Sequence, residues 1–386
     1  MDITIHPGKL NGTLAAIPSK SQAHRMLICA AFADGPTMLI CPETNQDIEA
    51  TVDGLCALGA TIRKTEDGYH ITPATALPAE AVLNCRESGS TLRFLLPVAG
   101  ALGVKTTFRM EGRLPNRPLS PLWEEMVRMG CRLSRPNDTT ILCEGKLKSG
   151  KYTVAGNVSS QFITGLLLAF SLMESPCLLD VIGKLESVPY IEMTKQVLEM
   201  FPSRHTPGHL TVEGDWSNAA FFLAAKALGS NLSVNNLSEE SKQGDRAVAD
   251  WIPRLQNRCI ISAADIPDLV PILSIVAAAK EGAVFTDIGR LRLKESDRVV
   301  STIAMLEALG GKAEASANTL TVYGTGLIGG TVDSFHDHRI AMSATIAATV
   351  CKKNVILLDA ECVSKSYPRF FEEYRRLGGN YEQYLR

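Results

Sequence analysis

The feature that most constrains the fold is a pattern that recurs along the 386-residue chain: an amphipathic helix ends at an apolar residue, often followed by Gly, and a strand begins. Clear copies end at Leu58-Gly59, Met129-Gly130, Leu309-Gly310 and Leu377-Gly378, and weaker ones at Met200 and Leu255. Gly is favoured after the last turn because it adopts the left-handed conformation at little cost. The copies lie roughly 55 to 70 residues apart, which indicates a repeated structural unit.

Each repeat contains further strands and a second, more apolar helix. These apolar helices are expected at 91–102, 161–173, 216–228, 267–280 and 338–350. Helices this apolar must be buried nearly all round. Because the chain is too long for one ordinary core, we predict an α/β protein of two domains with three units each, helices inside and sheets outside. We place a domain boundary near residue 215, where a strand ends before a new helix starts.

The bulk composition excludes several classes of protein. A net charge of −2 argues against a nucleic-acid scaffold or a membrane-surface protein. The N-terminus has no apolar segment typical of a secretory signal, and the longest apolar run, Phe162 to Met173, is too short to span a bilayer. None of the ten cysteines forms a C-x-x-C pair. We therefore expect reduced, mostly buried cysteines in a cytoplasmic protein.

Hydroxyls and cations gather where the first helix is expected to begin. Ser19, Lys20, Ser21 and Arg25 precede or open the apolar run 26–32. Free backbone amides, hydroxyls and cations together can hold a phosphate or a carboxylate. A capped surface helix with solvated charges explains this stretch equally well when it is taken alone.

The same combination returns at other expected helix starts and loops. They are 86–93 with Arg93, the Pro-bracketed loop 112–118 with Arg117, 158–162 with two Ser and a Gln, the charge run 290–298, 336–339 with Arg339, and the loop around Lys365. Within the charge run, the spacing from Lys294 and Glu295 to Asp297 and Arg298 predicts one shared helix face. Ordinary capping or an exposed turn accounts for each stretch singly.

Taken together, these junctions predict one site. Equivalent strand-to-helix junctions of a symmetric two-domain protein converge on one cleft, which here receives eight cations: Lys20, Arg25, Arg93, Arg117, Lys294, Arg298, Arg339 and Lys365. Asp268, at the mouth of an apolar helix, is either a partner of the helix dipole or a general base. A carboxylate base among many cations indicates transfer chemistry on phosphorylated or carboxylated small molecules.

Two further motifs do not indicate a function. His336-Asp337-His338 could ligate a metal, but no further ligand is spaced to complete a site. Gly324-x-Gly326-x-x-Gly329 matches a dinucleotide fingerprint, but the residues after it, 330–333, are predicted to form a strand, whereas the fingerprint requires a helix there.

The motifs resemble those of the enolpyruvyl transferase family, most closely the branch that acts on shikimate 3-phosphate. The resemblance runs from end to end and rests on Ser19-Lys20-Ser21-x-x-His24-Arg25, Ser88-Gly89-Ser90-x-x-Arg93, Arg117-Pro118, Ser159-Ser160-Gln161-Phe162, Pro189-Tyr190-Ile191, Glu213-Gly214-Asp215, Pro267-Asp268, Lys294-Glu295-Ser296-Asp297-Arg298, Asp337-His338-Arg339 and Lys365-Ser366-Tyr367-Pro368. It implies a two-domain inside-out barrel, each domain built of three βαβαββ units. One domain would comprise residues 1–18 plus 216–386 and the other 19–215, with the active site in the cleft between them.

The resemblance also implies a reaction, in which the enolpyruvyl group of phosphoenolpyruvate is transferred to the 5-hydroxyl of shikimate 3-phosphate and phosphate is released, a step of the shikimate pathway to chorismate and the aromatic amino acids. The implied ligands of shikimate 3-phosphate are Ser21, Arg25, Ser159, Ser160, Gln161, Ser187, Tyr190, Asp268 and Lys294. Those of phosphoenolpyruvate are Lys20, Gly89, Arg117, Gln161, Arg298, Arg339 and Lys365. The implied catalytic residues are Asp268 as base, and Glu295 with Lys20 or Lys365 at the methylene carbon. No metal, organic cofactor, nucleic acid or membrane is implied, and we expect a monomer.

The chain departs from the family pattern in a few places. Glu87 stands where the family usually has Asn, Arg290 stands where an Asn is frequent, and the chain is short around 202–209 and 257–259. Glu87 is the only support for a non-catalytic paralogue, and the joint presence of Asp268, Glu295 and Lys365 argues against one. The branch that acts on UDP-N-acetylglucosamine has a reactive Cys in the loop 112–118, which is absent here. RNA 3′-phosphate cyclases are disfavoured because the chain has no basic surplus.

Overall fold

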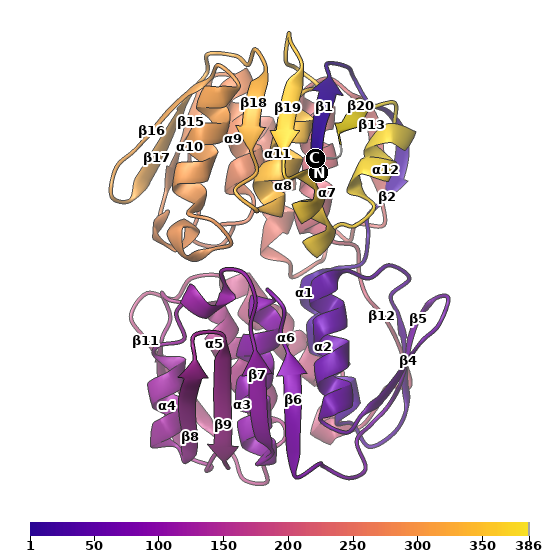
Figure 1. Ribbon diagram of the computed structural model, residues 1–386, viewed down its shortest axis with the longest axis vertical. Coiled ribbons are helices and arrows are strands. Elements are labelled where there is room, and N and C mark those ends of the chain that lie inside the picture. The colour runs from indigo at the N-terminus through magenta and orange to yellow at the C-terminus, as the bar shows by residue number, and fades with distance from the viewer. Residues whose placement is uncertain (385–386) are drawn as a thin grey trace. The chain divides into compact units, whose positions relative to one another are not determined.

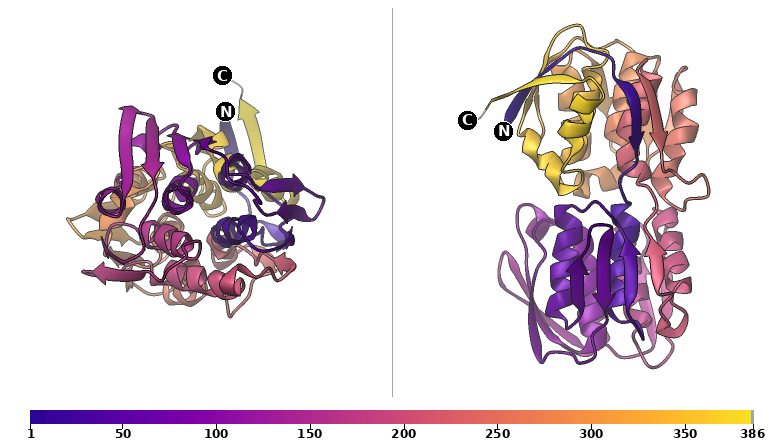
Figure 2. Two further views of the ribbon diagram at one scale, coloured as in Figure 1. Left: turned by 90° about the horizontal axis from the view of Figure 1, so that it is seen from below. Right: turned by 90° about the vertical axis from the view of Figure 1, so that its right-hand side faces the viewer.

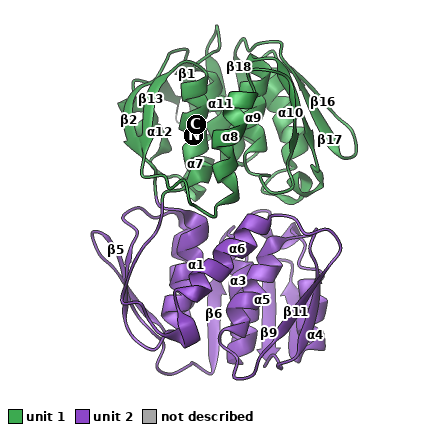
Figure 3. Ribbon diagram, turned by 180° about the vertical axis from the view of Figure 1, so that it is seen from behind, with its two compact units in different colours: residues 1–17, 214–386 green, residues 18–213 purple. Residues whose placement is uncertain are grey.

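A computed structural model describes residues 1–384, which form two compact units coloured separately in Figure 3. Unit 1 comprises Met1–Ile17 and the chain from Gly214 onward, and unit 2 comprises Pro18–Glu213. The division falls one residue before the first boundary expected from the sequence and two residues before the second.

Unit 2 consists of three sheets and six α-helices. Its helices are α1 (Lys20–Ala31), α2 (Gln46–Ala57), α3 (Gly89–Leu102), α4 (Leu122–Arg128), α5 (Ser160–Phe170) and α6 (Val188–Glu199). Its strands are β3 (Thr37–Ile40), β4 (Thr61–Lys64), β5 (Gly68–Thr72), β6 (Glu80–Asn84), β7 (Lys105–Arg109), β8 (Cys131–Asn137), β9 (Thr140–Gly145), β10 (Lys151–Ala155), β11 (Leu178–Ile182) and β12 (His209–Thr211). The strand orders are β12-β3-β5-β4, β6-β7-β9-β8 and β10-β11.

Unit 1 repeats this plan. Its helices are α7 (Trp216–Ala227), α8 (Val248–Arg254), α9 (Val270–Ala279), α10 (Arg298–Ala308), α11 (His338–Ala347) and α12 (Phe370–Arg376). Its strands are β1 (Asp2–His6), β2 (Asn11–Ala15), β13 (Asn231–Asn235), β14 (Cys259–Ser262), β15 (Gly282–Thr286), β16 (Lys312–Ala315), β17 (Thr319–Tyr323), β18 (Gly330–Asp333), β19 (Val355–Leu358) and β20 (Asn380–Tyr384). The strand orders are β18-β19-β1-β20, β14-β15-β17-β16 and β13-β2.

In each unit the strands lie around the more apolar helices, such as α3, α9 and α11 (Figures 1 and 2). The reason is visible in the burial of the helices: every residue of α11 and all but one residue of α9 are buried, as are most residues of α3. Strands instead alternate, as in β6, where only Ala81 and Leu83 are buried. An apolar helix can satisfy its backbone internally and bury every side, whereas an alternating strand buries one face.

Two of the six repeats are shortened, at the places where the sequence is short. After α6 the chain passes through a 3₁₀ turn, Pro202–Arg204, into β12, which pairs with β3. After α8 it enters β14, which pairs with β15. Neither helix is followed by a hairpin that returns to its own sheet, so within the described residues β10-β11 and β13-β2 have two strands each.

Candidate active site

The start of α1 is capped by Ser19, whose hydroxyl accepts a hydrogen bond from the backbone N–H of Gln22. Of the two serines near the start of this helix, Ser19 and Ser21, it is therefore Ser19 that caps it. Lys20 follows, and its ammonium lies 2.8 Å from Oδ2 of Asp47, which is buried in the first turn of α2. Asp47 is not among the site residues predicted from the sequence. The sequence did contain a signal, Asn45 followed by Asp47, since a capping residue and then an acid are favoured at a helix N-terminus.

Arg25 ties three helices of unit 2 together. Its Nε donates to Thr194 Oγ1 at 2.8 Å, its Nη1 to the Ser21 carbonyl at 2.5 Å, and its Nη2 to Thr164 Oγ1 and the Tyr190 carbonyl, both at 3.1 Å. Burial lowers the pKa of Arg25 to about 10, so it stays charged at neutral pH. Four of its five N–H groups are therefore used within the unit, and Arg25 holds Ser21 and Tyr190 in place.

A second network joins the starts of α3 and α5. Arg93 donates from Nη1 to Gln161 Oε1 at 2.7 Å and from Nη2 to the Pro118 carbonyl at 2.9 Å. Gln161 in turn donates from Nε2 to Ser90 Oγ at 3.0 Å, and its backbone N–H bonds to the capping Ser159. Arg93, one of the cations predicted to line the site, thus positions Gln161 and the loop that carries Arg117.

Gly89 and Arg117 are adjacent, which explains why position 89 is glycine. A Cβ atom at Gly89 would lie only 2.7 Å from Arg117 Nη1 and 3.1 Å from its Cζ. The guanidinium therefore packs directly on the backbone of Gly89 at the start of α3. A helix N-terminus with a guanidinium against it attracts anions through both the backbone dipoles and the full charge.

The unusual Glu87 points at the loop 112–118. Its carboxylate occupies the space where a side chain of Gly112 would be, since a Cβ there would overlap Glu87 Oε1. Gly112 also has φ of +54°, a conformation that glycine adopts at little cost. The neighbouring Arg86 pairs with Asp53 at 2.9 Å and with Glu49 at 3.6 Å. The carboxylate of Glu87 is thus accommodated by a glycine in the Arg117 loop.

The remaining expected ligands in unit 2 lie at the starts of α5 and α6. Ser160 is buried in the first turn of α5. Ser187, also buried, directly precedes α6 with φ of +56°, a conformation unusual for a residue other than glycine, and its side chain makes no capping hydrogen bond. Strained backbone of this kind is concentrated at functional sites, which supports Ser187 as a positioned hydroxyl.

In unit 1, Asp268 lies between two cations. Its Oδ1 accepts from Lys294 Nζ at 2.9 Å and from Arg298 Nη1 at 2.5 Å. Burial acts to raise the pKa of Asp268, but the charges of Lys294, Arg298 and Arg339 outweigh it and hold the pKa well below its usual value. Burial lowers the pKa of Lys294 in spite of its carboxylate partner. Asp268 is therefore ionised, and Lys294 is the more easily deprotonated cation.

Arg298 is the centre of a buried ion network. Its Nε donates to Asp337 Oδ2 at 2.8 Å and its Nη2 to Glu295 Oε2 at 2.8 Å. The side chains of Arg298 and Asp337 are 1% and 0% exposed. Glu295 Oε1 also lies 3.9 Å from Lys365 Nζ, and Ser296 donates to Asp337. One guanidinium thus holds the two expected catalytic carboxylates, Asp268 and Glu295, on a common frame.

The prediction that Lys294, Glu295, Asp297 and Arg298 share a helix face is wrong. Gly289–Leu293 is a 3₁₀ helix and Lys294 is extended. Asp297 then caps α10 by accepting from the N–H groups of Val299 and Val300, so the helix begins at Arg298. The charged residues before Arg298 therefore lie on a loop, from which Lys294 and Glu295 both reach partners in the network.

Arg339 opens α11 and is anchored by unit 1 itself. Its Nη1 donates to the Ser217 carbonyl at 2.7 Å, and its backbone N–H bonds to Asp337. The Ser217 hydroxyl bonds to Asp245, a fully buried carboxylate that the sequence analysis missed. Burial, and next the charge of Asp268, raise the pKa of Asp245 to about 6. No pattern around Asp245 marked it, because only tertiary packing brings it to Ser217.

The structure brings the predicted residues together within each unit. In unit 2 the contacts link Ser21, Arg25 and Tyr190, and separately Gly89 with Arg117 and Ser159 with Gln161. In unit 1 they link Asp268, Lys294, Glu295, Arg298 and Lys365. Asp337 appeared in a sequence motif without a role, and the structure shows that it fixes Arg298 and the start of α11.

Two features are absent from the described residues, 1–384. In this part of the chain no group of three or more His, Cys, Asp or Glu side chains is arranged to hold a metal ion. His336 pairs with Asp359 at 2.8 Å. Along the same residues, no helix has the length and apolar character that crossing a bilayer requires.

The sequence matches one protein-family model, described as EPSP synthase (3-phosphoshikimate 1-carboxyvinyltransferase), over residues 5–260 and 259–374. A 3-phosphoshikimate 1-carboxyvinyltransferase of Clostridium beijerinckii is 36% identical, and the match covers 99% of both chains. The enzyme of the same name from Clostridioides difficile is 35% identical over 99% of this chain and 98% of the relative.

Solved structures show the same fold. An EPSP synthase from Acinetobacter baumannii superposes with a TM-score of 0.82 at 20% identity, covering all of both chains. The enolpyruvyl transferase NikO from Streptomyces tendae gives a TM-score of 0.76 at 18% identity, covering 99% of this chain and 98% of that one. The two-domain inside-out α/β fold expected from the sequence is confirmed.

Proposed function

The chain belongs to the EPSP synthase family and catalyses that family's reaction, and we propose that the residues described above divide its two anionic substrates between them. The acceptor is shikimate 3-phosphate, the donor is phosphoenolpyruvate, and the products are 5-enolpyruvylshikimate 3-phosphate and phosphate. The observation that carries the proposal is the network in unit 1, where Asp268 and Glu295 are held by one buried guanidinium beside Lys294 and Lys365.

Shikimate 3-phosphate would be held mainly by unit 2. Ser21, Ser159, Ser160, Gln161, Ser187 and Tyr190 offer neutral hydrogen-bonding groups, and Arg25 a cation that fixes their arrangement. Asp268 and Lys294 of unit 1 would reach the same substrate. Hydroxyl and amide donors suit a phosphate dianion because they bind it without a counter-charge that must first be displaced.

Phosphoenolpyruvate would be held by cations of both units: Lys20, Gly89, Arg117 and Gln161 in unit 2, and Arg298, Arg339 and Lys365 in unit 1. Each set of ligands therefore draws on residues of both units. Cations around the transferring group stabilise the charge that develops on the departing phosphate.

Asp268 would accept the proton of the 5-hydroxyl as the oxygen attacks C2 of phosphoenolpyruvate, while Glu295, with Lys365 or Lys20, delivers a proton to the methylene carbon. The resulting tetrahedral intermediate then loses phosphate and returns that proton to restore the double bond. A base works best with a pKa near the working pH. The depressed pKa of Asp268 rises if Lys294 transfers its hydrogen bond from Asp268 to shikimate 3-phosphate.

The decisive assay measures phosphate release with each substrate alone and with both. We expect release only when phosphoenolpyruvate and shikimate 3-phosphate are present together. Asp268→Asn should abolish turnover and leave shikimate 3-phosphate binding largely intact, whereas Asp265→Asn, three residues earlier in the same loop, should retain turnover. Release with UDP-N-acetylglucosamine as acceptor contradicts the proposed function, and normal turnover by Asp268→Asn contradicts the proposed base.

We further propose that the protein acts as a cytoplasmic monomer. Light scattering of the purified chain tests the oligomeric state.

A further inference from the structure

The glycine motif set aside in the sequence, Gly324-x-Gly326-x-x-Gly329, has a structural role in unit 1. A Cβ at Gly324 would lie 2.1 Å from the carbonyl oxygen of Lys280, and one at Gly329 would lie 2.3 Å from that of Lys353. Gly326 donates its N–H to the Ala278 carbonyl at 2.9 Å. The strand β18 follows directly, as predicted. The glycines therefore let this loop lie against the backbone at the ends of two helices.

This loop forms one wall of a cavity of about 320 Å³. The other walls come from the C-terminal ends of α7, α9 and α11, three helices that pack against one another (Figure 3). The lining residues are Leu228, Ala279, Lys280, Thr325, Gly326, Leu327, Ile328, Val350 and Lys352. Cavities that bind small molecules start at about 300 Å³, so this one has room for a compact ligand.

The cavity is lined by both lysines and apolar side chains. Lys280 and Lys352 line it, and Lys9 donates from Nζ to the Leu228 carbonyl at 2.5 Å. Burial, and next repulsion by Lys280, lower the pKa of Lys9, so these two ammonium groups influence each other. None of the lining residues, all of them in the described part of the chain, is acidic. Leu228 and Leu327 are buried and offer hydrocarbon surface.

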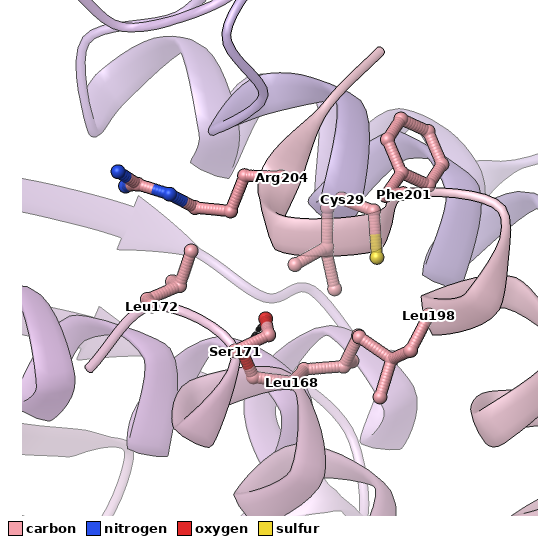
Figure 4. Close-up of a pocket in the computed structure, with 8 residues that line it drawn as sticks. Cys29, Leu168, Ser171, Leu172, Leu198, Phe201 and Arg204 are labelled. Carbon is pink, nitrogen blue, oxygen red and sulfur yellow. Dashed lines mark hydrogen bonds between the residues drawn. The ribbon is translucent and has the colours of Figure 1, made fainter. Parts of the chain in front are cut away.

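A different meeting of helix ends, in unit 2, encloses far less space. There the ends of α1, α5 and α6 enclose only about 10 Å³, enough for a single water molecule. Figure 4 shows the side chains of Leu168 and Leu198 pointing toward one another in this space. The large cavity of unit 1 is therefore not an unavoidable result of three helix ends meeting in this fold.

We propose that this cavity of unit 1 binds a small monocarboxylate with a compact aryl or branched hydrocarbon body. The carboxylate would lie among Lys280, Lys352 and Lys9, near the Thr325 hydroxyl, and the body would pack on the apolar wall. The carbonyls at the helix C-termini carry partial negative charge, which disfavours a dianion such as phosphate in the same place.

This binding site is separate from the proposed catalytic residues. Asp268 precedes α9 and Arg339 opens α11, whereas the cavity lies at the other ends of these helices. A helix of ten residues is about 15 Å long, so one ligand of this size does not reach both places. The proposal goes beyond the proposed function and does not depend on it.

The test is a ¹⁹F NMR titration of the full chain with 4-fluorobenzoate, with neutral 4-fluorobenzamide as a probe of the same shape. We expect a saturable shift for the carboxylate and at least about fivefold weaker binding of the amide. Lys280→Met and Lys352→Met keep the hydrocarbon stem and should each weaken the carboxylate about fivefold or more. Lys195→Met, on an exposed helix face of unit 2, and Lys294→Met, at the proposed catalytic site, should leave its affinity unchanged.

Three results overturn the proposal: no saturable shift up to about 20 mM carboxylate, equal binding of the amide, or loss of binding in Lys294→Met with retention in both cavity variants. The melting temperature of each variant identifies any that fails to fold. Because two single substitutions probe the same cavity, one unfolded variant still leaves the other as a test.

Discussion

The buried network around Arg298 makes a quantitative prediction about stability. Arg298→Met removes a guanidinium that is 1% exposed and leaves three carboxylates without it. Asp268 and Glu295 keep a second cation, Lys294 and Lys365 respectively, and are 25% and 15% exposed. Asp337 is fully buried, so the cost of losing its counter-charge falls mainly there.

The magnitude follows from that difference. Removing one partner of a buried ion pair costs about 3–5 kcal/mol, because the remaining charge has no compensation. In a folding unit of about 150–250 residues, each kcal/mol lowers the melting temperature by about 2–4 °C. We therefore expect Arg298→Met to melt about 6–20 °C below the wild type. Arg292→Met breaks an exposed pair with Asp297 and should cost no more than about 0.5 kcal/mol.

The assay is thermal unfolding followed by circular dichroism at neutral pH, and the decisive variant is the double substitution Arg298→Met with Asp337→Asn. Asn keeps the helix cap and removes the buried charge, so the double variant should melt above Arg298→Met. If the double variant instead melts lower than both single variants, the loss comes from packing and the electrostatic reasoning is refuted. A shift below about 2 °C for Arg298→Met would also refute it.

Three other substitutions test separate parts of the structure. Gly89→Ala places a methyl group against Arg117 and should raise the KM for phosphoenolpyruvate about tenfold or more, with little change for shikimate 3-phosphate, in steady-state assays. Asp245 has its pKa raised to about 6 in the folded protein. The unfolded chain releases this proton near pH 4, so the stability of the wild type should fall as the pH rises from about 4 to about 6. Asp245→Asn should accordingly stabilise the protein by about 3 kcal/mol at pH 7.5 and by about half of that at pH 5, measured by urea unfolding. Arg25→Lys loses the planar fork that bonds three helices and should destabilise unit 2 by about 2 kcal/mol or more in the same assay, whereas preserved stability would show that these hydrogen bonds contribute little.

Much of the fold was predictable from local sequence patterns. Apolar helices such as α9 and α11 are recognised because their burial leaves no polar face, and the glycine after Leu309 marks a helix end that the structure contains. The strand after Gly329 was likewise predicted by its composition. The start of α10 was misplaced because the charge run before it has helical spacing, and only the capping by Asp297 shows where the helix begins.

The candidate site was predictable only in part. Cations at helix starts, such as Lys20 and Arg339, are visible in the sequence because hydroxyls and apolar runs frame them. Their contacts are not, since only tertiary packing brings Asp47 to Lys20 and brings Asp245 to Ser217, whose carbonyl accepts from Arg339. Sequence likewise does not show that Arg93 donates to Gln161 and to the Pro118 carbonyl.

The pairing of these cations has a consequence for the chemistry. Lys20 is paired with Asp47, Lys294 with Asp268, and Arg298 with Asp337, so the protein supplies a carboxylate for each. A substrate anion that takes Lys294 away from Asp268 removes one of the charges that hold the pKa of Asp268 low, while Arg298 stays fixed by Asp337. The base then becomes stronger when the acceptor is bound. In the proposed mechanism this would couple proton abstraction to occupancy of the shikimate 3-phosphate site through Lys294, because Lys294 is 19% exposed whereas Arg298 is 1% exposed.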